Sequence, residues 1–285
     1  MTVPAMPPRF ARADPPEVAA LRRLKISHPE LGPAVDMQID LVTLYRRVQS
    51  RISTPWLEFD RDAVAAGLRA GRPVVRFEHV PFDWGEVRGL IRQIVDLCRR
   101  FDVIEQADAD AVHALVRAGR PSPDDGKAWY NERGAGADLS PGQIPDALAQ
   151  ILPLAARPFI ARAVDVARPL VNLSDWMRPT CPYCGGAPEL AAIGVDGERR
   201  LLCGRCAGDW PFDEVICPHC DSRDVSRRTS FASRDGRYRL IACDACRRYV
   251  KAYIARGADR PVMLDVDTIA TLPLDAVAAQ NGYSA

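Results

Sequence analysis

Four C-x-x-C pairs constrain this chain more than any other feature of its sequence. They are Cys181/Cys184, Cys203/Cys206, Cys217/Cys220 and Cys243/Cys246. Eighteen residues separate the first pair from the second, and 22 separate the third pair from the fourth. Both spacings are typical of zinc ribbons and rubredoxin-like modules, in which two such turns hold one metal ion between four thiolates. Modules with so small a core need the ion to fold.

The two halves of this cysteine-rich region repeat each other. "CPYCG" corresponds to "CPHCD", and "RRLLCGRC" corresponds to "YRLIACDAC". The repeat predicts a duplicated module in which each copy closes its own site. Site 1 then has the ligands Cys181, Cys184, Cys203 and Cys206. Site 2 has the ligands Cys217, Cys220, Cys243 and Cys246. In the interleaved alternative the first pair joins the third, which would place the ten residues 207–216 in a strained crossing. Four sulfur ligands fit iron or zinc, and the ligands alone do not decide between them.

Composition and the N-terminal segment predict a cytoplasmic protein. The 285 residues are 47% hydrophobic and 26% charged with a formal net charge of +1, which gives no global case for nucleic acid or acidic membranes. The N-terminus lacks the apolar core of a secretory signal, and we expect no membrane insertion because no run of eighteen apolar residues is present. Cytosolic thiols stay reduced, which favours metal binding over disulfides.

The hydrophobic pattern changes near Pro179 and divides the chain. Upstream, apolar residues recur at helical spacing, whereas alternating runs lead into the later cysteine pairs. The predicted fold class is α+β, with an all-helical domain at 34–178 followed by two tandem rubredoxin-like or zinc-ribbon modules of short β-strands, at 179–212 and 213–285. The second module carries a C-terminal tail. Seven prolines in residues 1–33 predict an extended or mobile arm, and Pro153 is expected to break the last helix of the helical domain.

Three features outside the metal ligands have a structural and a functional interpretation. Cys98 lies on an apolar helical stripe, so we expect a core residue. His219 lies inside "CPHC" and is expected to support the thiolates rather than bind the ion, because four cysteines already complete the site. The stretch 217–251 carries nine Arg and Lys against four acids. This excess is either a basic face for nucleic acid or an offset to the negative thiolate clusters, and we favour the second interpretation.

The cysteine-rich region resembles the FdhE family of formate dehydrogenase accessory proteins. The similarity lies in "CPYCGGAPELAAI", "RRLLCGRCAGDWPFDEVICPHCDS" and "YRLIACDACRRYVKAY", in Trp210 between the second and third pairs, and in the closing "DVDTIATLPLDAVAAQNGY". The resemblance implies a cytoplasmic maturation factor, or chaperone, that binds the catalytic, molybdenum-containing subunit of respiratory formate dehydrogenase. It also implies rubredoxin-type iron, with zinc as the alternative at one or both sites. Since "CPHCD" lacks the glycine of "CPYCG", site 2 is expected to be more zinc-ribbon-like.

We therefore predict a metal-binding accessory protein that is not an enzyme and acts by binding the formate dehydrogenase catalytic subunit. Two alternatives remain open. One is a zinc-ribbon nucleic-acid-binding protein that uses the basic 217–251 region, and the other is a rubredoxin-like electron-transfer protein. The near-neutral net charge disfavours nucleic acid as the partner, and a homo-oligomer is compatible with the sequence.

Overall fold

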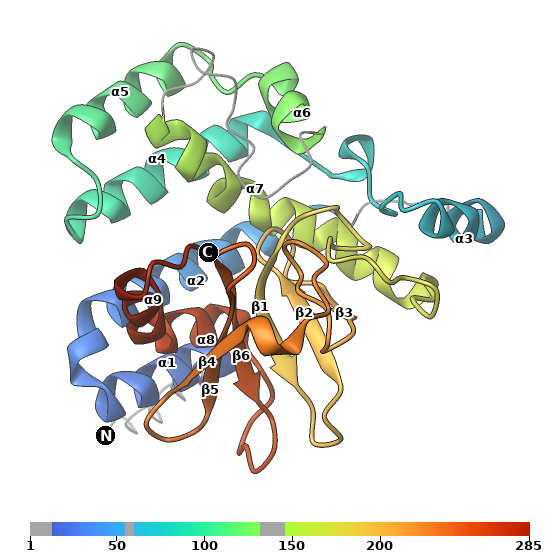
Figure 1. Cartoon of the computed structure of the whole chain (residues 1–285). Helices are drawn as coiled ribbons and strands as arrows, with labels where there is room; N and C mark the ends of the chain where they lie inside the picture. The colour runs from blue at the N-terminus through green and yellow to red at the C-terminus, as the bar shows by residue number, and fades with distance from the viewer. Residues whose placement is uncertain (1–12, 55–59, 132–145) are drawn as a thin grey trace, which may run out of the picture.

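A computed structural model describes residues 13–54, 60–131 and 146–285, which form a helical region above a mixed β-sheet (Figure 1). The α+β prediction is confirmed. The α-helices are α1 (Pro16–Ser27), α2 (Gly32–Gln49), α3 (Arg61–Arg69), α4 (Trp84–Arg100), α5 (Gln106–Arg117), α6 (Pro123–Asn131), α7 (Asp146–Ala167), α8 (Leu264–Ala270) and α9 (Leu272–Gln280). The strands are β1 (Pro188–Ile193), β2 (Arg199–Cys203), β3 (Asp209–Pro211), β4 (Arg228–Ala232), β5 (Tyr238–Cys243) and β6 (Arg248–Ile254).

The N-terminal segment is helical where it is described, so the prediction of an extended arm is wrong for those residues. Residues 1–12 lie outside the described part of the chain. Pro16 and Pro33 stand in the first turns of α1 and α2, where a missing N–H breaks no helical hydrogen bond. Leu21 of α1 is fully buried in a small core that includes Val266 of α8. Pro16 and Pro33 therefore mark helix starts rather than extended chain.

Helix α7 runs through Pro153, which the sequence predicted would break it. An interior proline removes one hydrogen bond and costs about 3 kcal/mol in a helix. In α7 this cost is offset by burial, because Leu152, Ala155 and Phe159 of the same helix are at most 1% exposed. Tertiary packing thus overrides the local signal.

Among the described residues, one helix is long and apolar enough to be compared with a membrane span. It is Asp146–Leu170, which comprises α7 and the turn after it and has a mean hydropathy of 1.2. Its apolar side chains pack in the main core of the molecule beside those of α4 and α2. This is the environment of a core helix.

The two cysteine modules form one continuous six-stranded sheet. The strand order is β3-β2-β1-β6-β5-β4, so each module contributes three neighbouring antiparallel strands. The modules join through β1 and β6, which pair in parallel from Leu190 opposite Lys251 to Ile193 opposite Ile254. The predicted duplication is therefore visible in the sheet, with the seam at its centre.

The two modules differ in the cores that they share. Cys181, Leu201 and Trp210 of the first module belong to the same buried cluster as α4 and α7. The second module packs Tyr238 and Leu240 against Leu274 of α9 in a separate cluster, while Val250 and Ala252 of its strand β6 belong to the main one. Helix α8 lies beside α1 and α2 (Figure 1). The predicted boundaries at 178/179 and 212/213 stay a prediction.

Candidate metal centres

The structure brings the eight predicted ligands together in two groups of four. In each group the four sulfur atoms lie within 4.8 Å of one another, and the groups are the sequential ones, site 1 and site 2. The Sγ–Sγ distances are 3.6 Å for Cys181–Cys206 and for Cys184–Cys203 in site 1. In site 2 they are 3.9 Å for Cys217–Cys246 and 3.8 Å for Cys220–Cys243. A tetrahedral ion with metal–sulfur bonds of about 2.3 Å needs edges of about 3.8 Å, so both groups fit zinc or iron.

All four C-x-x-C turns have the same backbone shape. In each turn the residue after the second cysteine has a positive φ: 75° at Gly185, 57° at Ala207, 57° at Asp221 and 58° at Arg247. The N–H of that residue donates to the carbonyl of the first cysteine of its pair, over 2.8–3.0 Å. Three turns thus adopt the left-handed region without glycine, at a strain of about 1–2 kcal/mol each. The missing glycine of "CPHCD" does not alter the turn.

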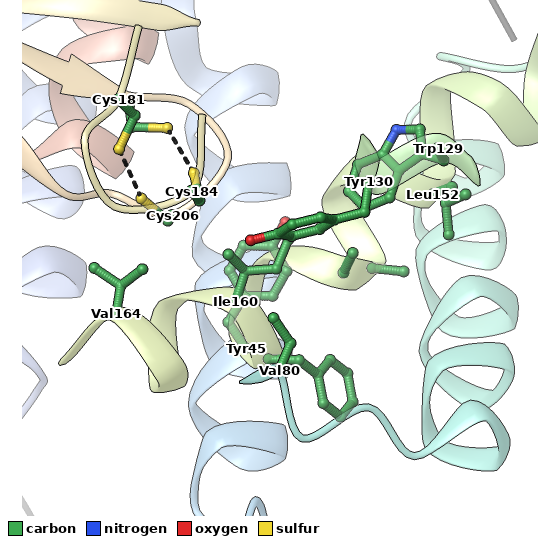
Figure 2. Close-up of a cluster of buried hydrophobic side chains, with 14 of the residues drawn as sticks. Tyr45, Val80, Trp129, Tyr130, Leu152, Ile160, Val164, Cys181, Cys184 and Cys206 are labelled. Atoms are coloured by element: carbon green, nitrogen blue, oxygen red, sulfur yellow. Dashed lines mark hydrogen bonds between the residues drawn. The ribbon is translucent and has the colours of Figure 1, made fainter. Parts of the chain in front are cut away.

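Site 1 is enclosed by the helical half of the chain. The exposed fractions of Cys181, Cys184, Cys203 and Cys206 are 0, 2, 0 and 2%. A segment before α4 hydrogen-bonds to the first turn: the N–H of Val74 donates to Pro182 O over 3.0 Å, and that of Val75 to Tyr183 O over 2.7 Å. Figure 2 shows the sulfur atoms of Cys181, Cys184 and Cys206 turned toward one another. This site belongs to the main core.

The second turn of site 1 is also fixed by the helical half. The guanidinium of Arg205 lies 4.8 Å from the ring centroid of Trp129 and donates to the carbonyl of Tyr130. The Tyr130 hydroxyl in turn donates to Val75 O over 2.9 Å. Helix α6 therefore contacts both turns of site 1, directly or through one residue.

Glycines let the chain pass close to the sulfurs of site 1. A Cβ added at Gly186 would lie 2.8 Å from the Cys203 sulfur, and one at Gly208 would lie 2.8 Å from the Tyr183 ring. These glycines follow the left-handed residue of each turn. The equivalent positions of site 2 are Ser222 and Arg248. Site 1 therefore has no space for side chains that site 2 accepts.

Site 2 lies at the surface. Cys217 and Cys243 are each 4% exposed, whereas Cys220 is exposed and Cys246 is half-buried. The Nε2 of His219 donates to Tyr249 O over 2.9 Å. This contact agrees with the expected supporting role, in which His219 braces the turn without binding the ion.

The thiols of the two sites differ in how readily they ionise. Burial raises the pKa of the Cys181 and Cys206 thiols well above the ordinary range, because a thiolate there would lose its water. At Cys243, desolvation acts in the same direction but is outweighed by hydrogen bonds from the N–H groups of Cys246 and Ala245, which lower its pKa to about 7. Four thiolates in such proximity require a positive ion between them.

The structure also places Cys98 and the basic stretch 217–251, which the sequence analysis singled out. Cys98 is buried in α4, in the core, and burial raises the pKa of its thiol. Many basic side chains of 217–251 bind groups of the same chain: Arg228, Arg237, Arg247 and Arg248 donate to backbone carbonyls, and Lys251 donates to Asp275. The contacts of site 1 with Val74, Val75, Tyr130 and Arg205 have no signal in the sequence.

Comparison with curated proteins identifies relatives that share about half of the chain. The chain is 30% identical over 145 residues to a protein named FdhE homolog from Stutzerimonas stutzeri, covering 47% of each. It is 30% identical over 153 residues to an FdhE homolog from Pseudomonas aeruginosa, covering 47% of the chain and 48% of that relative. The matched stretches span about half the length of these relatives. No protein-family model matches the chain.

Comparison with solved structures gives a match to nearly the whole fold. The crystal structure of the FdhE protein from Pseudomonas aeruginosa superposes with a TM-score of 0.63, covering 94% of this chain and 91% of that one, at 22% sequence identity. At this identity the match carries the fold alone. Together with the sequence matches, it confirms the expected FdhE resemblance.

Proposed function

We propose that this FdhE-like chain is a metal-binding accessory protein needed for the assembly or activation of respiratory formate dehydrogenase. It would act in the cytoplasm by binding the catalytic subunit of that enzyme, and it would have no catalytic activity of its own. The observation that carries the proposal is the presence of two four-cysteine clusters in a fold shared with a crystallised FdhE protein. The step to formate dehydrogenase follows from the FdhE resemblance.

We further propose that the eight clustered cysteines are metal ligands, with iron at both sites and zinc as the alternative at either. Bound iron would add one-electron chemistry to the structural role that both metals can fill. The chain's own contribution is to hold four sulfurs at the corners of a tetrahedron and to shield them from water to different degrees. Ferric iron bound by thiolates absorbs visible light and zinc does not, so the spectrum of protein purified without oxygen separates the two metals.

The partner is tested by capture of the purified catalytic subunit on the immobilised full-length protein. We expect the affinity to change only modestly between low and moderate salt, because binding of a protein partner does not release counterions from nucleic-acid phosphates. Binding to RNA or DNA that falls steeply with salt would favour the nucleic-acid alternative, since each neutralised phosphate releases counterions. Arg228, Arg237, Arg247 and Arg248 already donate to carbonyls of the same chain, which argues against the nucleic-acid alternative.

The biological role is tested by deleting the gene in a host that has no second copy. We expect the formate dehydrogenase polypeptide to be present but inactive, and activity to return with the wild-type gene. Normal formate oxidation in the deletion strain would overturn the proposed function.

A further inference from the structure

The two metal sites share their ligands and turn geometry but differ in access. We propose that site 2 is an exchange site, from which soluble thiols and chelators capture the ion while the protein stays folded. The ion of site 1, in contrast, leaves only when the surrounding core opens. The inference rests on the proposal that both clusters bind metal, and it is independent of the partner.

Access decides how a thiolate-bound ion is exchanged, because an incoming ligand must reach the ion or a sulfur before a metal–sulfur bond breaks. At site 2 the exposed Cys220 and the half-buried Cys246 give such an approach from solvent. At site 1 each sulfur belongs to a residue that is at most 2% exposed. An incoming thiol can bind the ion at site 2 as a thiolate while one protein thiolate leaves and takes up the proton that the thiol gives up, which keeps four sulfurs on the metal.

Packing around the sulfurs also favours exchange at site 2 over exchange at site 1. Site 1 has Gly186 and Gly208 at the positions that approach the sulfurs, where even a methyl group would come within 2.8 Å of a neighbour. Site 2 has Ser222 and Arg248 there. The close packing at site 1 resists an added ligand, whereas the turns of site 2 accept a side chain at the same positions and are less tightly packed.

The parts of the chain that contact the turns of the two sites also differ in size. Site 1 is tied to the helical half through Val74 and Val75. The last turn of site 2 contacts a short surface segment, residues 281–285: the Tyr283 hydroxyl donates to Asp244 over 2.5 Å, and its ring lies 4.0 Å from the Arg247 guanidinium. A short surface segment opens at a lower free energy than a core does, so site 2 can release its ion by local opening.

The experiment uses the full-length protein loaded with two equivalents of zinc and an excess of the chromogenic chelator 4-(2-pyridylazo)resorcinol. We expect two phases of equal amplitude. The fast phase should be at least about tenfold faster than the slow one, a difference of about 1.4 kcal/mol in barrier. Far-ultraviolet circular dichroism should remain unchanged through the fast phase. Adding glutathione should accelerate the fast phase alone.

Matched variants assign the phases. Cys220→Ser should remove the fast phase, and Cys184→Ser, at the equivalent position of site 1, should remove the slow one. Because Cys184→Ser threatens folding, iodoacetamide labelling of the wild type followed by mass spectrometry gives an independent assignment, with Cys220 and Cys246 labelled first. Release of both ions in one phase, a fast phase that survives Cys220→Ser, first labelling of site 1 cysteines, or failure to bind two ions would overturn the inference. Loss of partner capture alone would overturn the proposed function instead.

Discussion

Site 1 and site 2 are built from the same turn and the same ligands, yet they stand in different parts of the molecule. Each turn has a left-handed residue after its second cysteine and the same hydrogen bond back to the first. Site 1 lies inside a core shared with α4 and α7, while site 2 opens to solvent at Cys220. The comparison teaches that the ligand motif sets the arrangement of the four sulfurs, whereas the surroundings set how far those sulfurs are exposed to solvent.

The same contrast extends to the modules around the sites. The first module depends on the helical half for its core. The second module is held on α8 by a buried polar network in which Asp267 accepts from the Tyr238 hydroxyl over 2.7 Å and from Arg260 over 2.5 Å. A fully paired buried carboxylate fixes a unique arrangement but depends on every partner.

The largest expected effect separates the two sites by stability. Cys203→Ser should remove the site 1 ion and destabilise the helical half with it, by more than about 5 kcal/mol, because structural zinc binds small modules with about 10–16 kcal/mol. Cys243→Ser, the equivalent change at site 2, should spare the site 1 ion and cost clearly less. Thermal unfolding monitored by circular dichroism, with the metal content of each variant, checks this. Equal destabilisation by the two variants would break the comparison.

The next effect concerns the polar network of the second module. Asp267→Asn removes the charge that pairs with Arg260 in a buried position and should destabilise the protein by about 3–5 kcal/mol. Asp259→Asn, at an exposed carboxylate nearby, is the control and should change stability by less than about 0.5 kcal/mol. Urea unfolding of both variants measures the difference. A loss below 1 kcal/mol (about the size of one neutral hydrogen bond) for Asp267→Asn would argue against the network.

A smaller effect tests the packing around the sulfurs. Gly186→Ala places a methyl group against the Cys203 sulfur and should cost about 1–3 kcal/mol, the usual range for overpacking. Ser222→Ala is the matched change at site 2 and should be nearly neutral, because a Cβ is already present there. Differential scanning calorimetry of zinc-loaded protein compares the two. A neutral Gly186→Ala variant would show that site 1 is looser than its geometry indicates.

The smallest effect acts on the segment that holds the last turn of site 2. Tyr283→Phe deletes the hydroxyl that donates to Asp244 and should cost about 1 kcal/mol. It should accelerate zinc release from site 2 to a chelator and leave release from site 1 unchanged. Faster release from both sites would mean that the segment stabilises the whole sheet rather than one turn.

Much of the candidate site could be predicted from the sequence, because the information is local. The spacing of the cysteines and the internal repeat indicated which pairs meet, and the structure groups them so. The α+β class followed from the change of hydrophobic period near Pro179. Features that depend on contacts distant in sequence could not be predicted: the helix through Pro153, the N-terminal helix α1, and the enclosure of site 1 by Val75 and Tyr130.

The difference between the two sites also could not be predicted from the sequence around each cysteine pair. The sequence singled out the absence of glycine in "CPHCD" as the distinction, yet Asp221 adopts the same left-handed backbone as Gly185. The real difference lies one residue further along, where Gly186 faces the Cys203 sulfur and Ser222 stands at the equivalent position. Only the folded arrangement reveals why the second glycine of "CGG" matters.

The metal content of the purified protein tests the central claim, two separate four-thiolate sites, most directly. Inductively coupled plasma mass spectrometry of anaerobically purified protein should find two ions of iron or zinc per wild-type chain. Cys220→Ser should retain one ion, the site 1 ion, and the Cys203→Ser chain that stays soluble should retain one ion at site 2. One ion or none in the wild type, or the loss of both ions with Cys220→Ser, would contradict the account.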